Sequence, residues 1–106
     1  MNLSDIRKIV SARWRFNSDE YPHIRTMSPE AHRDFSRSHI LKHAMKSLGK
    51  MAAISEDADH VEPRLQTPHA EMAVLIAKML VNLMQLADSY GITNEELERV
   101  IRDEDV

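Results

Sequence analysis

One stretch of the sequence, Ala70 to Ala87, is apolar almost all the way round when its residues are placed at helical spacing. A helix of this kind must contact neighbours on most of its sides. A chain of 106 residues has too little core of its own to supply all of those neighbours. We therefore expect homo-oligomerisation, as a dimer or a tetramer, to complete the core. In the helix that contains this stretch and runs to about Tyr90, only a narrow polar stripe interrupts the apolar surface: Glu71, Lys78, Asn82, Gln85 and Ser89.

The same stretch is not expected to cross a membrane. A lone membrane span would bear the charged side chains of Glu71 and Lys78 only at considerable cost. Residues 1–5 have no basic region followed by an apolar run, so they do not form a signal peptide. The sequence has no cysteine, which excludes disulfides and thiolate metal sites. These features predict a cytoplasmic protein without a membrane partner.

Two long helices are bounded by proline and glycine signals. The first begins at Ser28-Pro29-Glu30, with a capping serine and a proline in the first turn, and its apolar residues recur at steps of three and four as far as Ala52. Gly49 lies within it and suggests close helix packing there, since glycine costs roughly 1 kcal/mol in a helix relative to alanine. The second runs from Thr67-Pro68 to about Tyr90 and stops at the glycine that follows.

The remaining segments are shorter. Residues 2–16 have apolar residues at helical spacing and predict a first amphipathic helix, with Asn2 or Ser4 as its N-cap. Residues 17–26 predict a loop. The acidic segment 55–63 lacks an apolar stripe and ends in proline, so we expect it to connect the two long helices. Thr93-Asn94-Glu95-Glu96 is a capping box that begins a short last helix.

These elements predict one all-α domain spanning residues 1–106. We expect a helical bundle of about four helices, with two long antiparallel helices, in which residues 1–27 form an N-terminal helix and loop and residues 28–106 form the helical core. The net charge of −3 divides into +2 over residues 1–60 (ten basic, eight acidic) and −5 over residues 61–106 (four basic, nine acidic). This asymmetry suits antiparallel or head-to-tail pairing, and it is too mild to indicate a nucleic-acid-binding protein.

The sequence from about Ser38 to Asp103 resembles the MazG-like all-α nucleoside triphosphate pyrophosphohydrolases. The resemblance rests on a helix that contains Gly49 and on a later helix that ends in Leu86-Ala87-Asp88-Ser89-Tyr90-Gly91-Ile92. It implies a helical fold whose acidic residues hold Mg²⁺ on a nucleoside triphosphate and help a water release pyrophosphate.

The acidic signatures of that family are largely replaced here. The family's Glu-Glu-x-x-Glu motif corresponds to Lys46-Ser47-Leu48-Gly49-Lys50, and its Glu-x-x-Asp motif corresponds to Glu71-Met72-Ala73-Val74. Glu71 is therefore the one candidate catalytic acid that the resemblance supplies. The family implies Mg²⁺ as cofactor, but most of its ligands are missing.

Basic residues stand where the resemblance places metal ligands. Lys46 and Lys50 lie one helical turn apart and would repel a metal ion, and Lys42 lies one turn before Lys46. These three lysines are candidates for binding phosphate directly in place of a metal. The simpler interpretation is that they are solvated or form salt bridges, as surface lysines usually do.

Histidines provide a separate candidate metal site. His39 and His43 stand at i and i+4, a spacing that lets two imidazoles reach one ion, and His69 or Glu71 from the next helix would complete a site for zinc or another transition metal. No His-Glu-x-x-His motif accompanies the pair, so surface histidines are the simpler alternative.

Three functional hypotheses follow. The first is a MazG-related protein that binds nucleotides, or acts as an interaction module, through a lost or rebuilt metal site. The second is an active pyrophosphohydrolase, and the missing acids argue against it. The third is a nucleic-acid-associated helical protein, which the net charge of −3 and the scarcity of aromatic residues disfavour.

Overall fold

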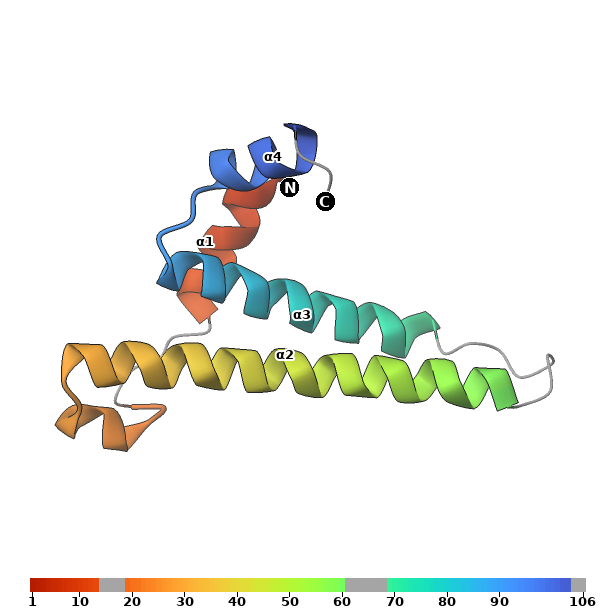
Figure 1. Ribbon diagram of the computed structural model, residues 1–106, viewed down its shortest axis with the longest axis horizontal. Coiled ribbons are helices and arrows are strands. Elements are labelled where there is room, and N and C mark those ends of the chain that lie inside the picture. The colour runs from red at the N-terminus through yellow and green to blue at the C-terminus, as the bar shows by residue number, and fades with distance from the viewer. Residues whose placement is uncertain (14–18, 61–68, 104–106) are drawn as a thin grey trace.

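The computed structural model describes residues 1–13, 19–60 and 69–103 of the chain. The described residues are helical and contain no strand, so the all-α prediction is confirmed. Figure 1 shows two long helices lying side by side and antiparallel, with two shorter helices at one end of the pair. The elements in order are α1 (Leu3–Arg13), a 3₁₀ helix η1 (Pro22–Thr26), α2 (Pro29–His60), α3 (His69–Ser89) and α4 (Asn94–Asp103).

Three of the predicted helix starts are confirmed by capping hydrogen bonds, whereas the start predicted at Thr67-Pro68 lies outside the described residues. The Asn2 Oδ1 atom accepts from the Asp5 backbone N–H at 2.9 Å and so caps α1. The Ser28 Oγ atom accepts from the Ala31 backbone N–H at 3.1 Å at the start of α2. Thr93 caps α4 by accepting from the Glu96 backbone N–H at 3.1 Å.

The end of α3 is a Schellman motif built on Gly91. This glycine has φ +67°, a left-handed conformation that other residues adopt only with strain. The Ile92 N–H donates to the Ala87 carbonyl at 2.9 Å, and the Gly91 N–H donates to the Asp88 carbonyl at 3.1 Å. The predicted glycine stop is therefore correct.

Three sequence predictions require correction. The segment 55–63 was expected to connect the long helices, but α2 continues to His60; residues 61–63 lie outside the described ranges. No glycine or proline interrupts residues 55–60, so extending the helix costs little per residue. Within the predicted loop, Pro22–Thr26 forms a 3₁₀ turn. Among the described residues of one copy, no neighbour packs closely at Gly49, because a Cβ atom there would meet nothing within 4 Å.

Arg7 fastens α1 to the turn between α3 and α4. Its guanidinium forms an ion pair with Asp88 at 2.5 Å and donates to the Ile92 carbonyl and to Asn94 Oδ1, each at 3.0 Å. The Asn94 amide in turn donates to Ser4 Oγ at 3.0 Å. A charged side chain from the first helix thus binds the end of one helix and the start of another.

Arg37 of α2 binds the C-terminal end of α3, next to the turn that Arg7 binds. Its Nε and Nη2 atoms donate to the hydroxyl and the carbonyl of Ser89, each at 2.8 Å. The guanidinium carbon also lies 3.8 Å from the centre of the Tyr90 ring, within cation–π range. A positive charge at a helix C-terminus interacts favourably with the helix dipole. Because Arg37 lies on α2 and Ser89 on α3, this contact also helps fix the register of the two helices.

The buried core is small. Six apolar residues of the described ranges are buried, and they lie between α2 and α3 or near α1 and η1: Val10, Ile24, Ile40, Leu75, Met84 and Ala87. Much of α3 stays exposed within one copy of the chain. By length and composition this helix, His69–Ser89, could cross a membrane, which is weak support for a span because core helices pass the same test.

Candidate functional site

A groove of about 380 Å³, lined by both polar and apolar side chains, runs along one side of the α2–α3 pair. Its residues come in nearly equal numbers from the two helices. From α2 they are His43, Lys46, Ser47 and Lys50; from α3 they are Leu75, Lys78, Val81, Asn82 and Gln85.

Helical periodicity brings these residues together. His43, Lys46 and Lys50 follow one another at steps of three and four on α2, so they share one face. Lys78, Asn82 and Gln85 do the same on α3. They belong to the narrow polar stripe of the otherwise apolar helix, and the structure turns this part of the stripe toward α2. The polar stripe therefore builds the α3 wall of the groove.

The groove is positively charged. Lys46, Lys50 and Lys78 all line it, and its lining contains no Asp or Glu. Within the described residues, none of these three ammonium groups forms an ion pair. Ser47 and Leu75 are buried, so the groove has a closed floor. Three cations facing one space without a carboxylate create a favourable position for an anion.

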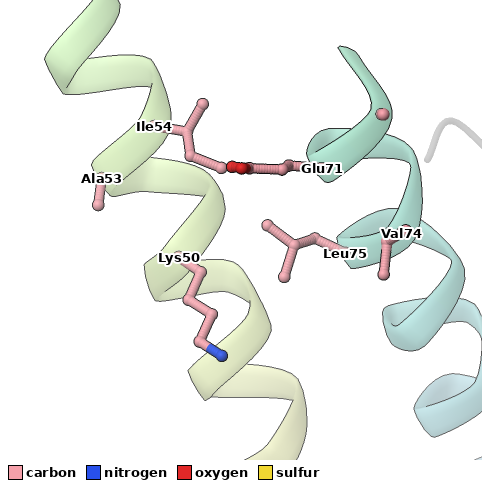
Figure 2. Close-up of a pocket in the computed structure, with 7 residues that line it drawn as sticks. Lys50, Ala53, Ile54, Glu71, Val74 and Leu75 are labelled. Atoms are coloured by element: carbon pink, nitrogen blue, oxygen red, sulfur yellow. The ribbon is translucent and has the colours of Figure 1, made fainter. Parts of the chain in front are cut away.

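An apolar pocket of about 520 Å³ continues from the groove toward the open end of the helix pair. Lys50 and Leu75 line both spaces. Figure 2 shows Glu71 reaching from α3 toward Ile54 of α2, whereas the Lys50 ammonium points the other way along α2. The predicted catalytic acid thus lies beside the cationic groove.

The structure brings two of the three candidate phosphate-binding lysines together. Lys46 and Lys50 line the groove, whereas Lys42 is exposed and does not line it. The sequence interpretation missed Lys78, Asn82 and Gln85 as site residues. Their position in the stripe of α3 was visible, but which side of α2 the stripe would face depends on how the two helices pack.

The predicted histidine triad is not assembled. The Nε2 atoms of His39 and His43 lie 2.9 Å apart, so the i,i+4 pair forms. His69 is the first residue of α3, and its neighbour Glu71 lines a pocket together with Ile54 of α2. Ile54 lies 11 residues after His43, which is about 16 Å along the helix at 1.5 Å per residue. His69 therefore lies far from the His39–His43 pair. Among the described residues no group of three His, Cys, Asp or Glu side chains could hold a metal ion.

The His39 ring belongs to a cluster of aromatic rings that packs η1 and the preceding Tyr21 against α2. Tyr21 packs edge-on to His39 with ring centres 5.2 Å apart, and Phe35 lies 5.5 Å from the same ring. Burial lowers the pKa of His39 below 6.5, and the nearby His43, Lys42 and His23 lower it further. His39 is therefore held in its neutral form more firmly than a free imidazole.

No protein-family model, no curated protein and no solved structure matches this chain. The resemblance to the MazG-like pyrophosphohydrolases accordingly stays a prediction. The functional argument rests on the chain's own residues, chiefly the groove.

Proposed function

We propose that this chain is a helical binding module whose α2–α3 groove takes phosphate-bearing ligands, with nucleotides as the class expected from the sequence. The observation that carries the proposal is the convergence of Lys46, Lys50 and Lys78 on one groove that no carboxylate lines. Ammonium groups bind phosphates as point charges. The side-chain amides of Asn82 and Gln85 add hydrogen-bond donors on the α3 wall.

The same arrangement favours binding over magnesium-dependent hydrolysis. Mg²⁺ takes near-octahedral oxygen ligation, usually with carboxylates and water. Glu71 is the one carboxylate of the neighbouring pocket, and Lys50 lines that pocket as well. Mg²⁺ beside these lysines would be repelled and would find few carboxylate ligands, so we propose that the phosphate ligand binds without Mg²⁺.

A titration with inorganic triphosphate and with ATP, each in EDTA, tests this proposal. We expect both to bind the parent protein and to weaken as salt rises from about 0.1 to 0.5 M, because screening shortens the reach of charge pairs. The double variant Lys46→Glu/Lys50→Glu should lose at least tenfold in affinity, since it turns two attractive charges into repulsive ones.

The matched control is Lys42→Glu, which makes the same kind of charge change on the same helix outside the groove. It should leave affinity within about threefold of the parent, as expected for a screened charge beyond direct contact. Equal binding by the parent and the double variant, or no binding by the parent in any condition, would overturn the proposal.

We further propose that two copies associate through an apolar face formed by α2 and α3. Each residue of this face is 47% to 70% exposed: Leu41, Met45, Leu48, Ile76, Leu80 and Leu83. At 100° per residue, these positions lie roughly 160° round their helices from the groove residues. The apolar face and the groove therefore lie on opposite sides of the two-helix layer.

The exposed area supports this association. The chain exposes 8172 Å². A compact monomer of 12.2 kDa would expose about 6,100 Å², so the excess is about 2,000 Å². Obligate dimers bury about 1,000 to 2,500 Å² of surface per partner, and the excess exposed area of this chain falls within that range. Pairing of two apolar faces would give a four-helix bundle of α2 and α3 from each copy, and it would bury most of the exposed apolar surface of α3.

A further inference from the structure

His39 and His43 aim their Nε2 atoms at each other across one turn of α2. The two atoms lie 2.9 Å apart, and the ring planes meet at 61°. Two neutral imidazoles can form such a contact only if one Nε2 carries a hydrogen and donates while the other accepts. The acceptor ring then carries its hydrogen on Nδ1.

The separation of these nitrogens fits two neighbouring positions on one metal ion. Imidazole nitrogens bind Zn²⁺ and similar ions at about 2.0–2.1 Å. Two nitrogens 2.9 Å apart would then subtend about 90° at the metal, whereas a regular tetrahedron would hold them about 3.3 Å apart. A right angle is the cis angle of square-planar and octahedral ions, which is the geometry of Cu²⁺ and Ni²⁺.

We propose that His39 and His43 form a binding site for a divalent late transition metal of the Cu²⁺ and Ni²⁺ class. The ion takes the Nε2 lone pair of each ring, and water fills its other positions. The ring that donates in the metal-free pair moves its hydrogen from Nε2 to Nδ1, so both rings stay neutral and no proton is lost.

The surroundings hold one ligand in place before the metal arrives. The Tyr21 and Phe35 rings pack against His39 and hold this ligand in place. The exposed His43 ring lies close enough that a tilt brings both Nε2 lone pairs onto one ion beside the line between the two nitrogens. Holding one ligand in advance lowers the entropy lost on binding. Lys42 and Lys46 oppose any cation electrostatically, which selects for ions that bond strongly to imidazole and against Mg²⁺.

The site shares His43 with the lining of the groove, so its test contains no phosphate. We expect the full chain to bind one Cu²⁺ or Ni²⁺ per copy in calorimetry. His43→Ala should weaken that binding at least tenfold, because one imidazole replaces a two-imidazole chelate. Electron paramagnetic resonance of the Cu²⁺ complex should show two coordinating nitrogens in the parent and one in the variant.

His69→Ala is the matched control, and it should bind the metal as tightly as the parent. His43 is exposed, so its replacement should leave the fold intact; circular dichroism of the variant verifies this. Unchanged metal affinity in His43→Ala would overturn the site. A loss in His69→Ala as large as that in His43→Ala would also overturn it, because the ligands would then include a residue that this geometry excludes.

Discussion

Single charged side chains fasten the elements of this small protein together. Arg7 and Arg37 approach α3 from two different helices, and both bind polar groups at its C-terminal end. Hydrogen bonds that involve a charged group contribute about 1.5–3 kcal/mol, more than neutral ones. Such contacts matter here because few apolar residues are buried in one copy.

A residue-scale prediction concerns His39. Its pKa in the folded chain is lowered from 6.5 by burial and by His43, Lys42 and His23, and the Tyr21 and Phe35 rings pack against it. The unfolded chain therefore binds the proton more readily than the folded chain does. We expect this residue's contribution to stability to be fully present above pH 6.5 and to be lost as pH falls through the lower, folded pKa.

Proton NMR titration of the imidazoles measures that pKa directly, and it should lie below 6.5. The variant His39→Gln should unfold with a free energy that depends less on pH between about 5 and 7, because the titrating group is gone. An imidazole of His39 that titrates at or above 6.5 would contradict the prediction.

The family resemblance singled out Lys46 and Lys50 as candidate site residues, and helical geometry alone places them on one face of α2. Lys78 could not be paired with them from the sequence. Its place depends on the register of α3 against α2, which Arg37 and the buried contacts fix only in the folded chain. The position of His69 relative to His39 and His43 depends on the same register.

At the scale of elements, local signals specify where most helices begin and end. The capping residues Asn2, Ser28 and Thr93 and the stop at Gly91 were all recognisable, since each acts through its own backbone neighbours. The end of α2 was not recognisable. Residues 55–60 have no apolar stripe, and they are helical because the helix propagates into them from the packed part of α2. The composition of this segment does not reveal that extension.

Replacing Gly91 tests the helix stop. A Cβ atom at this position would meet nothing within 4 Å, so Gly91→Ala adds no clash and the cost is backbone strain alone. At φ +67° that strain should lower the free energy of unfolding by about 1–2 kcal/mol. Chemical denaturation measures the change.

Gly49→Ala provides the matched control, because it adds the same methyl group inside α2 with equally open surroundings. It should stabilise the protein by up to about 1 kcal/mol, since alanine is the better helix former. A destabilising Gly49→Ala would mean that another chain packs closely there, and a neutral Gly91→Ala would mean that the turn relaxes.

At the scale of the whole molecule, the chain is extended for its length. Its radius of gyration is 16.9 Å, against about 13 Å for a compact domain of 106 residues. From the sequence, the apolar surface all round α3 predicted that some of its apolar side chains would stay exposed in one copy. In the structure the exposed apolar side chains of α2 and α3 gather on the apolar face opposite the groove.

Leu80→Asp tests association through that face. Leu80 is 47% exposed within one copy, so the substitution should leave the helices formed but place a charge in the proposed interface. An unpaired buried carboxylate costs several kcal/mol, enough to shift a micromolar dimer to monomer. Sedimentation velocity should show a parent dimer or tetramer and a monomeric variant with unchanged helical ellipticity.

Ile101→Asp is the control, because Ile101 is 70% exposed on α4, outside the apolar face. It should assemble as the parent does. A parent protein that sediments as a monomer at micromolar concentration would show that two apolar faces do not pair.

The anchoring of α1 by Arg7 also bears on the order in which the chain gains its structure during synthesis. Arg7 binds Asp88, Ile92 and Asn94, which lie 81 to 87 positions further along the chain. Because the ribosome adds about 5–20 residues per second, these partners are made roughly 4 to 17 seconds after Arg7. The position of α1 is thus fixed by residues that are translated more than eighty positions after it.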